Sequence, residues 1–224
     1  MIAHSERTAY GEVVAVFTGA RSGVAGTDNT ERYRSLLTRF PQIAALAYSE
    51  QVHGDAVLTV TKSAGDLHFA GEGDALLTNE AGHALLIRTA DCIPILFYSV
   101  SSPLAGAVHA GWRGLEKKIL TKVVRSLREK SSDLRFVVGP FIGERSYEVG
   151  SDVAAQFDAR HSEAKPADKF YLNLRTVLED ELAALQIEAA QVTWFAHDTL
   201  SNAEWYSARR GDSDRNFSVI YFSV

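Results

Sequence analysis

The chain has 224 residues, 46% of them hydrophobic and 23% charged, which is enough for one domain with a sizeable core. Its formal net charge of −5 argues against nucleic acid or an anionic membrane as a partner, and no apolar run reaches the roughly 18 residues of a membrane span. The single cysteine excludes an internal disulfide, and the first residues lack an export signal, so we expect one cytoplasmic domain over residues 1–224.

The first half of the chain predicts strands separated by loops and one helix. Val- and Thr-rich or alternating runs indicate strands, and glycine-punctuated polar runs indicate loops. Two apolar runs joined by Asn79-Glu80-Ala81-Gly82 are typical of a hairpin. The expected elements are a strand at 12–17, a loop at 18–29, a helix at 30–40, a strand at 56–61, a loop at 62–73 and hairpin strands at 74–78 and 84–89.

The second half predicts further strands and three helices, the first of them amphipathic from Leu115 to Leu127. Because hairpins mix with helices, we expect an α/β domain with mixed sheets rather than a purely parallel sheet. The other expected elements are strands at 93–100, 104–108, 135–138, 192–196 and 217–222 and helices at 152–160 and 174–185.

Reactive side chains lie where predicted strands end. His53 stands just before a strand, and the pair Asp91 and Cys92 interrupts two apolar strands. His109 would end a strand, and Arg113 would lie near the N-terminus of the amphipathic helix, where the free N–H groups suit an anion. Each residue alone has an ordinary structural interpretation, but strand ends are where sites are built. Together they predict one site.

Two interpretations of one cysteine with two histidines remain open. Zinc takes thiolate and imidazole ligands in tetrahedral geometry, and a catalytic zinc keeps its fourth position for water. Alternatively, Cys92 is a nucleophile that a histidine base activates. The sequence separations match no local zinc motif, so spacing does not decide between them. Of the other histidines, we expect His197 to be the one that can line the cleft and the rest to be structural or solvated.

These segments resemble the laccase-domain family, also called the YfiH-like or multicopper polyphenol oxidoreductase family, which includes purine nucleoside phosphorylases and a peptidoglycan editing factor. The most specific motifs are Ala-Asp-Cys-Ile-Pro at 90–94 and His-Ala-Gly-Trp-Arg-Gly at 109–114, in this order. The matching residues are 51–54, 73–79, 89–94, 109–114, 138–140, 142–143 and 147–149, with Ser207, Arg209 and Arg210 in place of a Ser-Tyr-Arg-Arg element.

The resemblance implies a layered α/β/β/α domain with mixed sheets and a zinc ion bound by His53, Cys92 and His109. It also implies phosphorolysis of adenosine, inosine and methylthioadenosine, together with adenosine deamination. Some relatives are instead described as amidases that remove wrongly incorporated serine from a muramyl precursor. For this chain, that activity would use Cys92 as nucleophile and His109 as base.

The sequence departs from the family pattern in two places. The family usually has an Arg-x-Gly-Gly-Val-Ser loop followed by a long stretch, whereas residues 18–27 here lead almost directly into a helix. This shortening changes the expected rim of the substrate site and the role of Arg21. The family's cysteine before Tyr-Glu-Val is Ser146 here, so that thiol is dispensable whereas Cys92 is not.

The supply of ligands distinguishes the possible functions. A multicopper oxidase needs many imidazoles, but this chain has seven histidines and no His-x-His pair, so polyphenol oxidation is not expected and zinc is favoured over copper. No Glu stands two residues after His53 or His109, so deamination would need another carboxylate than in known zinc deaminases. A non-enzymatic partner module is a third possibility, which does not require this cysteine–histidine set.

The leading hypothesis is zinc-dependent purine nucleoside cleavage by a monomer or weak homodimer. Its small-molecule partners would be a purine nucleoside and phosphate. We assign catalysis to His53, Cys92, His109 and Asp91, with Asp91 as general base or as the hydrogen-bond partner of a histidine ligand. We assign substrate binding to Gln51, Arg113 and Arg209.

Overall fold

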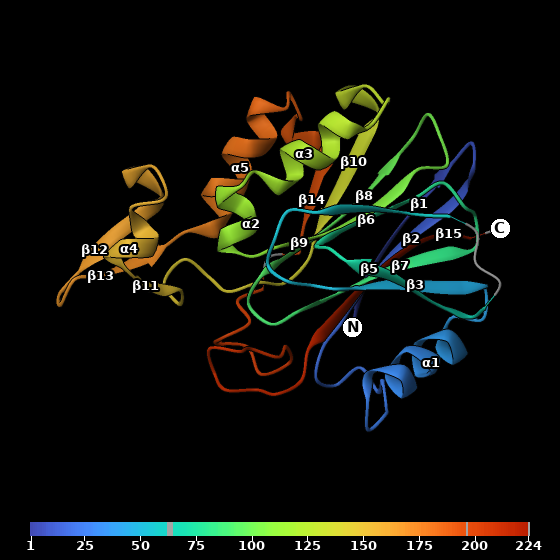
Figure 1. Cartoon of the computed structure of the whole chain (residues 1–224), viewed down its shortest axis with the longest axis horizontal. Coiled ribbons are helices and arrows are strands. Elements are labelled where there is room, and N and C mark those ends of the chain that lie inside the picture. Colours follow the sequence, from blue (N-terminus) through green and yellow to red (C-terminus); the bar gives the residue numbers. More distant parts are fainter. Residues whose placement is uncertain (62–64, 196, 224) are drawn as a thin grey trace.

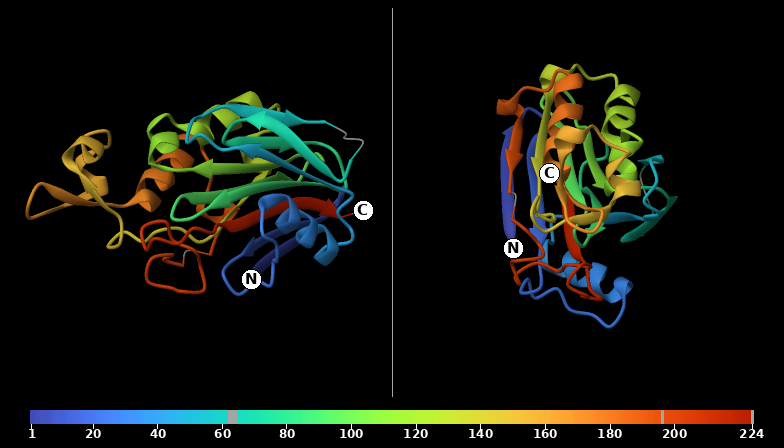
Figure 2. Two further views of the ribbon diagram at one scale, coloured as in Figure 1. Left: turned by 60° about the horizontal axis from the view of Figure 1, so that its bottom comes forward. Right: turned by 90° about the vertical axis from the view of Figure 1, so that its left-hand side faces the viewer.

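The computed structural model describes residues 1–61, 65–195 and 197–223, which fold into two packed six-stranded sheets with helices on both outer faces (Figures 1 and 2). In the first sheet, β1, β2, β15 and β7 pair antiparallel, and β7, β3 and β5 pair parallel. In spatial order its strands are β1 (Ile2–Thr8), β2 (Gly11–Thr18), β15 (Asn216–Ser223), β7 (His83–Thr89), β3 (Ala45–Glu50) and β5 (Leu67–Glu72).

The second sheet is also mixed, with parallel pairs at both edges and antiparallel pairs between them. Its order is β14 (Val192–Trp194), β10 (Leu134–Val138), β8 (Ile93–Ser99), β9 (Ala105–Ala110), β6 (Ala75–Thr78) and β4 (Val57–Val60). A small third sheet, of β11 (Glu148–Gly150), β13 (Lys169–Leu172) and β12 (Ser162–Lys165), projects from one end with α4 (Ser151–Ala154) (Figure 1).

Helices cover the outer faces of both sheets. The helix α1 (Asn29–Arg39) lies on the first sheet, and α2 (Trp112–Glu116), α3 (Ile119–Ser126) and α5 (Leu174–Ala184) lie on the opposite side of the molecule (Figure 2). Asp28 caps α1 by accepting from the Glu31 amide, and Asn173 caps α5 in the same way. The prediction of a mixed, layered α/β/β/α fold is confirmed.

The apolar core has three layers, which follow the side-chain alternation of the strands. Phe17, Leu85 and Leu96 lie between the two sheets. Because helices cover the outer faces as well, central strands such as β7 and β8 are buried on both sides and read as continuous apolar runs. One outer layer packs Leu36 of α1 against Leu46 and Val219 of the first sheet. The other packs Leu120 and Val123 of α3 and Leu178 of α5 against Phe97 of the second sheet.

Two predicted connections are wrong. The runs at 74–78 and 84–89 do not form a hairpin, because β6 pairs with β4 and β9 whereas β7 pairs with β3 and β15 in the other sheet. Apart from Arg88, which is partly exposed, the residues of both runs are buried, so the sequence does not show which sheet each run joins. Within the predicted loop at 62–73, residues 67–72 form β5; residues 62–64 lie outside the described part of the chain.

The predicted helices are too long in two places. The stripe from Leu115 to Leu127 is divided into α2 and α3 because Lys118 has left-handed backbone, with φ of 56°. The predicted helix at 152–160 contains only α4 and a later 3₁₀ turn at Ala159–His161. The strands β1, β3 and β11–β13 were not predicted, and Ala196, at the end of the predicted strand at 192–196, lies outside the described residues. No helix in the described part is long and apolar enough to cross a membrane.

Substitution of Gly106 tests the tightness of the second sheet. A Cβ at Gly106 would lie 2.1 Å from the Phe97 ring, which stacks on Phe136 at a centroid distance of 5.5 Å. Gly106→Ala should therefore lower the free energy of unfolding by about 1–3 kcal/mol in a urea titration. Gly65→Ala is the control, since its methyl group meets nothing nearer than 3.8 Å. Equal midpoints for the two variants would contradict the packing described here.

Candidate metal centre

One nitrogen of His53, one nitrogen of His109 and the sulfur of Cys92 all lie within 4.8 Å of one another. Cys92 immediately precedes β8 and His109 lies in the neighbouring β9, whose antiparallel register pairs Ile93 with Ala110. His53 reaches the same point from the loop after β3, and its ring lies edge-on to His109 with a centroid distance of 4.8 Å. The structure thus brings together the three residues that the sequence predicts as ligands.

Gly111 leaves room for this cluster. A Cβ at this position would lie 3.0 Å from the Cys92 sulfur and 3.2 Å from Cδ2 of His53. Any larger residue would push the sulfur or the ring away from their common point. Gly111, the N-cap residue of α2, is therefore a requirement of the site.

A fully buried carboxylate, Asp74, holds both histidines. One of its oxygens lies 2.7 Å from Nδ1 of His109 and accepts from the backbone N–H of His53 at 3.0 Å. The other accepts from the amides of Gly54 at 2.7 Å and Val52 at 3.3 Å. These bonds stabilise the left-handed backbone of His53, with φ of 57°, and engage Nδ1 of His109. The remaining nitrogen, Nε2 of His109, is the one left for a metal ion.

The electrostatics of the cluster favour a thiolate. Burial alone would raise the pKa of the Cys92 thiol, but the adjacent His109 and His53 rings outweigh burial and lower that pKa to about 6. Burial would lower the pKa of His109, but the Cys92 sulfur and the Asp74 carboxylate raise it to about 9. Without metal, the cluster is therefore a thiolate beside an imidazolium. Asp74 itself is buried, which alone would raise its pKa, yet hydrogen bonds from His109, Gly54 and Val52 lower it.

The donor set fits one transition-metal ion. One thiolate and two imidazoles are ligands that zinc and copper accept, and bonds of about 2.0–2.3 Å from a tetrahedral zinc require only a small closure of the three side chains. Cys92 is half-buried and His53 is exposed, so a fourth position faces a pocket rather than the core. Among the described residues, no other group of three such ligands was found.

The pocket over the cluster is basic because Arg88 and Arg215 line it, and neither arginine was predicted as a site residue. Arg88 is the penultimate residue of β7, and Arg215 immediately precedes β15. The described lining of this pocket contains no carboxylate, although the chain as a whole is acidic. The pocket has a volume of about 290 Å³ and is lined by Gln51, His53, Arg88, Ala90, Cys92, His109, Ala208 and Arg215.

A second pocket, of about 220 Å³, adjoins the first and shares Arg215. Its wall is the loop that is short relative to the family pattern, with contributions from Thr18, Gly19 and Ser22. Arg32 and Asp214, also in its lining, form an ion pair at 2.7 Å. The shortened loop thus forms the rim next to the metal pocket, whereas Arg21 does not line it.

Asp91 does not hold a histidine ligand. Its two oxygens accept from the Thr199 hydroxyl at 2.6 Å and from the Arg209 backbone N–H at 2.7 Å. The prediction that Asp91 is the partner of a histidine is therefore wrong for His109, because Asp74 has that position. Instead, Asp91 fastens the C-terminal loop to the segment that carries Cys92. Its role as a general base stays a prediction.

The three predicted substrate-binding residues have different surroundings. The amide of Gln51 donates to the Arg88 carbonyl and accepts from the Arg88 N–H, both at 2.7 Å, so it pairs with the end of β7 while lining the pocket. The Arg113 guanidinium lies over the Trp112 ring at 4.4 Å. Arg209 donates to the Glu148 carbonyl at 2.8 Å. Arg113 and Arg209 do not line the metal pocket, and all three assignments stay predictions.

Tyr147 was not singled out in the sequence as a site residue. The Arg209 guanidinium lies 5.2 Å from the centroid of its ring. Burial and the nearby Cys92 raise the pKa of its hydroxyl to about 12, so Tyr147 stays protonated at neutral pH. Ser146, at the position of the missing cysteine, donates to Asp198 at 2.6 Å and ties this segment to the C-terminal loop.

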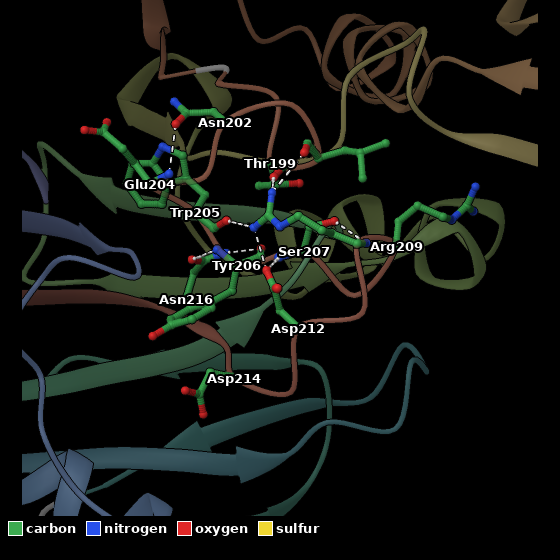
Figure 3. Close-up of polar contacts among 12 residues, drawn as sticks. Thr199, Asn202, Glu204, Trp205, Tyr206, Ser207, Arg209, Asp212, Asp214 and Asn216 are labelled. Atoms are coloured by element: carbon green, nitrogen blue, oxygen red, sulfur yellow. Dashed lines mark hydrogen bonds and ion pairs between the residues drawn. The ribbon is translucent and has the colours of Figure 1, made fainter.

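Figure 3 shows polar contacts that hold the C-terminal loop together between Thr199 and Asn216. Several contacts within this loop are made by Arg210. Its guanidinium donates to the carbonyls of Thr199 and Leu200, each at 2.9 Å, and to the Trp205 carbonyl and the Asp212 carboxylate. Arg210 therefore acts within the loop and fixes the backbone that carries Ala208 to the pocket. His197, the remaining histidine that could line the cleft, stacks on Trp205 at a centroid distance of 6.2 Å and is not in the described lining of the metal pocket.

Comparison with known proteins supports one family. A model of the family described as "Multi-copper polyphenol oxidoreductase laccase" matches residues 18–223. A Xylella fastidiosa protein named purine nucleoside phosphorylase is 34% identical over 90% of this chain and 82% of its own length. A Haemophilus influenzae protein of the same name is 32% identical over 77% and 72%. The crystal structure of a Neisseria meningitidis protein shares the fold with a TM-score of 0.82, at 24% identity over 100% of this chain and 99% of the other.

The role of Asp74 can be tested with a near-isosteric substitution. Asp74→Asn should weaken zinc affinity about 10- to 100-fold, because the amide group no longer orients His109 as a carboxylate does. Competition with a chromogenic chelator measures the affinity, and circular dichroism confirms that the variant folds. The matched control is Asp66→Asn, since Asp66 is exposed and, among the described residues, its carboxylate pairs with Arg34 at 3.8 Å. Wild-type zinc affinity in Asp74→Asn would show that the buried carboxylate does not organise the site.

The thiolate of the metal-free protein should be visible in alkylation rates. Because its pKa is lowered, Cys92 should react with iodoacetamide at a nearly constant rate above neutrality and more slowly as pH falls through about 6. His109→Ala should move this midpoint to higher pH, and zinc should protect the wild-type thiol. A wild-type midpoint near pH 8.5, the ordinary value for cysteine, would contradict the electrostatics described here.

Proposed function

This chain belongs to the multi-copper polyphenol oxidoreductase laccase family, and we propose that it is a zinc-dependent purine nucleoside phosphorylase that also deaminates adenosine. Adenosine, inosine and methylthioadenosine are the proposed nucleoside substrates. The observation that carries this proposal is the His53–Cys92–His109 cluster in a basic pocket. Relatives at 32–34% identity, named purine nucleoside phosphorylase, support the reaction class.

Zinc fits the cluster better than a multicopper centre does. Multicopper oxidation needs several copper sites rich in imidazole, whereas the described residues gather one group of two histidines and one cysteine. A thiolate ligand also suits a reducing compartment, consistent with our expectation of a cytoplasmic protein. We therefore propose one zinc ion per chain, bound by His53, Cys92 and His109, and no polyphenol oxidation.

In phosphorolysis a phosphate oxygen bonds to C1′ of the ribose while the bond from C1′ to the purine nitrogen breaks. The electron pair of the broken bond stays on the purine, which then takes up a proton. When bound, zinc supplies a Lewis acid that can polarise water or orient phosphate. The chain's part is to hold both reactants in the pocket, where positioning lowers the barrier, and Asp74 keeps His109 rigid for that purpose.

Deamination makes a different demand on the site. Water must add to C6 of adenine while ammonia leaves, so a group on the protein has to carry protons. The described pocket lining holds no carboxylate. The carboxylate next to Cys92 in the chain belongs to Asp91, whose two oxygens each accept one hydrogen bond. Asp91 is the proposed proton carrier, and this activity is assayed separately from phosphorolysis.

A thiol amidase is the second candidate, and the lowered pKa of Cys92 favours it. In that reaction the Cys92 thiolate would attack the amide carbonyl that joins the wrongly incorporated serine to the muramyl precursor. His109 would give a proton to the amine of the leaving serine as the carbon–nitrogen bond breaks, and water would then hydrolyse the thioester on Cys92. The raised pKa of His109 keeps that proton available at neutral pH. This activity would need no metal, whereas the proposed phosphorylase does.

The two functions are separated by one set of assays on purified protein. With adenosine and phosphate, the zinc-loaded enzyme should yield adenine and ribose 1-phosphate, and inosine where deamination occurs. Chelation or Cys92→Ala should abolish product, because chelation removes the zinc ion and the substitution removes one of its three protein ligands. Metal analysis should give close to one zinc per chain.

The exposed variant Arg34→Gln is the matched control, and it should retain wild-type rates. Product formation no greater than that of Cys92→Ala would refute the phosphorylase and deaminase proposal. Release of serine from the muramyl precursor by metal-free protein would instead establish the amidase.

A further inference from the structure

The metal pocket has two arginines that lack close carboxylate partners. In the part of the chain that the structure describes, the Arg88 guanidinium has one acidic neighbour, Glu50, at 3.7 Å, and the Glu50 side chain is 62% exposed. No carboxylate pairs with Arg215 among the described residues. Two other arginines near the site, Arg210 and Arg32, are by contrast paired with the carboxylates of Asp212 and Asp214.

The backbone around Arg88 is fixed. Both its N–H and its carbonyl pair with the amide of Gln51 at 2.7 Å, and its side chain is only 20% exposed. Arg88 is also the penultimate residue of β7, whose pairing with β15 brings Thr89 opposite Asn216. The residue that precedes Asn216 is Arg215, so the antiparallel register places the two arginines at the same end of the sheet.

Arg215 is fixed by its own loop. Its Nη1 donates to the carbonyls of Asp212 at 3.3 Å, Ser213 at 3.0 Å and Asp214 at 2.9 Å. Within the described residues, these bonds use one nitrogen and leave Nη2 and Nε without a partner. A guanidinium anchored through one nitrogen keeps a two-donor edge, which matches two oxygens of a tetrahedral oxyanion.

We propose that Arg88 and Arg215 form the phosphate subsite of the metal pocket. This assignment rests on the proposed function. It puts the phosphoryl group beside Arg88 and Arg215, whereas the sequence predicted Arg113 as the residue near an anion. Arg113 lies over Trp112 and outside the pocket lining, whereas Arg88 and Arg215 line the same cavity as His53, Cys92 and His109. Ala90 and Ala208 also line this cavity, and their small side chains leave room in it for a ligand.

Two sources can supply the phosphoryl group, namely free inorganic phosphate and a phosphate carried on the nucleoside. Phosphorolysis requires the first. In the second case the adjoining pocket that shares Arg215 would take the other end of a nucleotide. Inorganic phosphate and adenosine 5′-phosphate are therefore the two probes, and adenosine is the reference that lacks the anion.

The experiment measures affinity and turnover in the zinc-loaded protein. Arg88→Gln and Arg215→Gln should each weaken calorimetric binding of inorganic phosphate about tenfold or more, since each removes charged hydrogen bonds. In the phosphorolysis assay the same variants should raise the KM for phosphate more than they lower kcat. Arg34→Gln is the matched control for loss of an arginine, and zinc content is measured for every variant.

A variant that adds charge covers the case in which an arginine variant fails to fold. Ala208 is exposed, so Ala208→Glu should fold while repelling phosphate, and its phosphate affinity should also fall. If adenosine 5′-phosphate loses affinity in these variants and inorganic phosphate does not bind, the subsite takes a phosphate carried on the substrate.

The failure of the subsite and the failure of the proposed function give different results. Wild-type phosphate affinity in Arg88→Gln, Arg215→Gln and Ala208→Glu would overturn the subsite even if the enzyme is an active phosphorylase. Loss of phosphate binding in these variants, with no phosphorolysis by the wild type, would keep the subsite and overturn the phosphorylase. Absence of binding of both phosphate probes to the wild type would also overturn the subsite.

Discussion

The buried carboxylate of Asp74 is the contact on which the site depends. Its side chain binds the ring of His109 and the backbone of His53, and its own carbonyl accepts from the His109 N–H at 2.7 Å. Two segments that are 56 residues apart in the sequence are thereby held by one residue between them. Without this carboxylate, both histidine rings would still meet the Cys92 sulfur, but the His53 backbone and Nδ1 of His109 would lose the partner that they share, and the geometry of the cluster would change.

Burying a carboxylate is costly, and the fold offsets this cost locally. Asp74 accepts from three backbone N–H groups as well as from His109, so its charge is fully hydrogen-bonded. Because these bonds lower its pKa, they stabilise the folded state at pH values above the ordinary 3.8 of an aspartate, and this stabilisation is lost as pH falls through the lowered pKa. Folding and the proposed metal binding therefore depend on the same group, and a change at Asp74 should affect both.

The sequence predicts the three ligands better than what holds them. Cys92 and His109 lie at or near the ends of two strands that the local patterns predict, and the antiparallel pairing of those strands in the structure brings the two residues together. Asp74 also begins an apolar run, but that run was assigned to a hairpin with residues 84–89. With β6 in the wrong sheet, nothing placed Asp74 next to His109. The pairing of β6 with β9 is non-local, and apolar patterns do not encode it when strands are buried on both faces.

The arginines were missed for a related reason, because a cation in a pocket has the same local sequence as a cation on a surface. Arg88 and Arg215 are 127 residues apart and come together only through the pairing of β7 with β15. A chain of net charge −5 repels anions at long range, and beyond about 8–10 Å such charges are screened by salt. For the proposed phosphate subsite, selection of an anion therefore has to occur at short range, through fixed donors in a cavity whose described lining has no carboxylate. The strand order of the first sheet brings these donors to the proposed metal pocket.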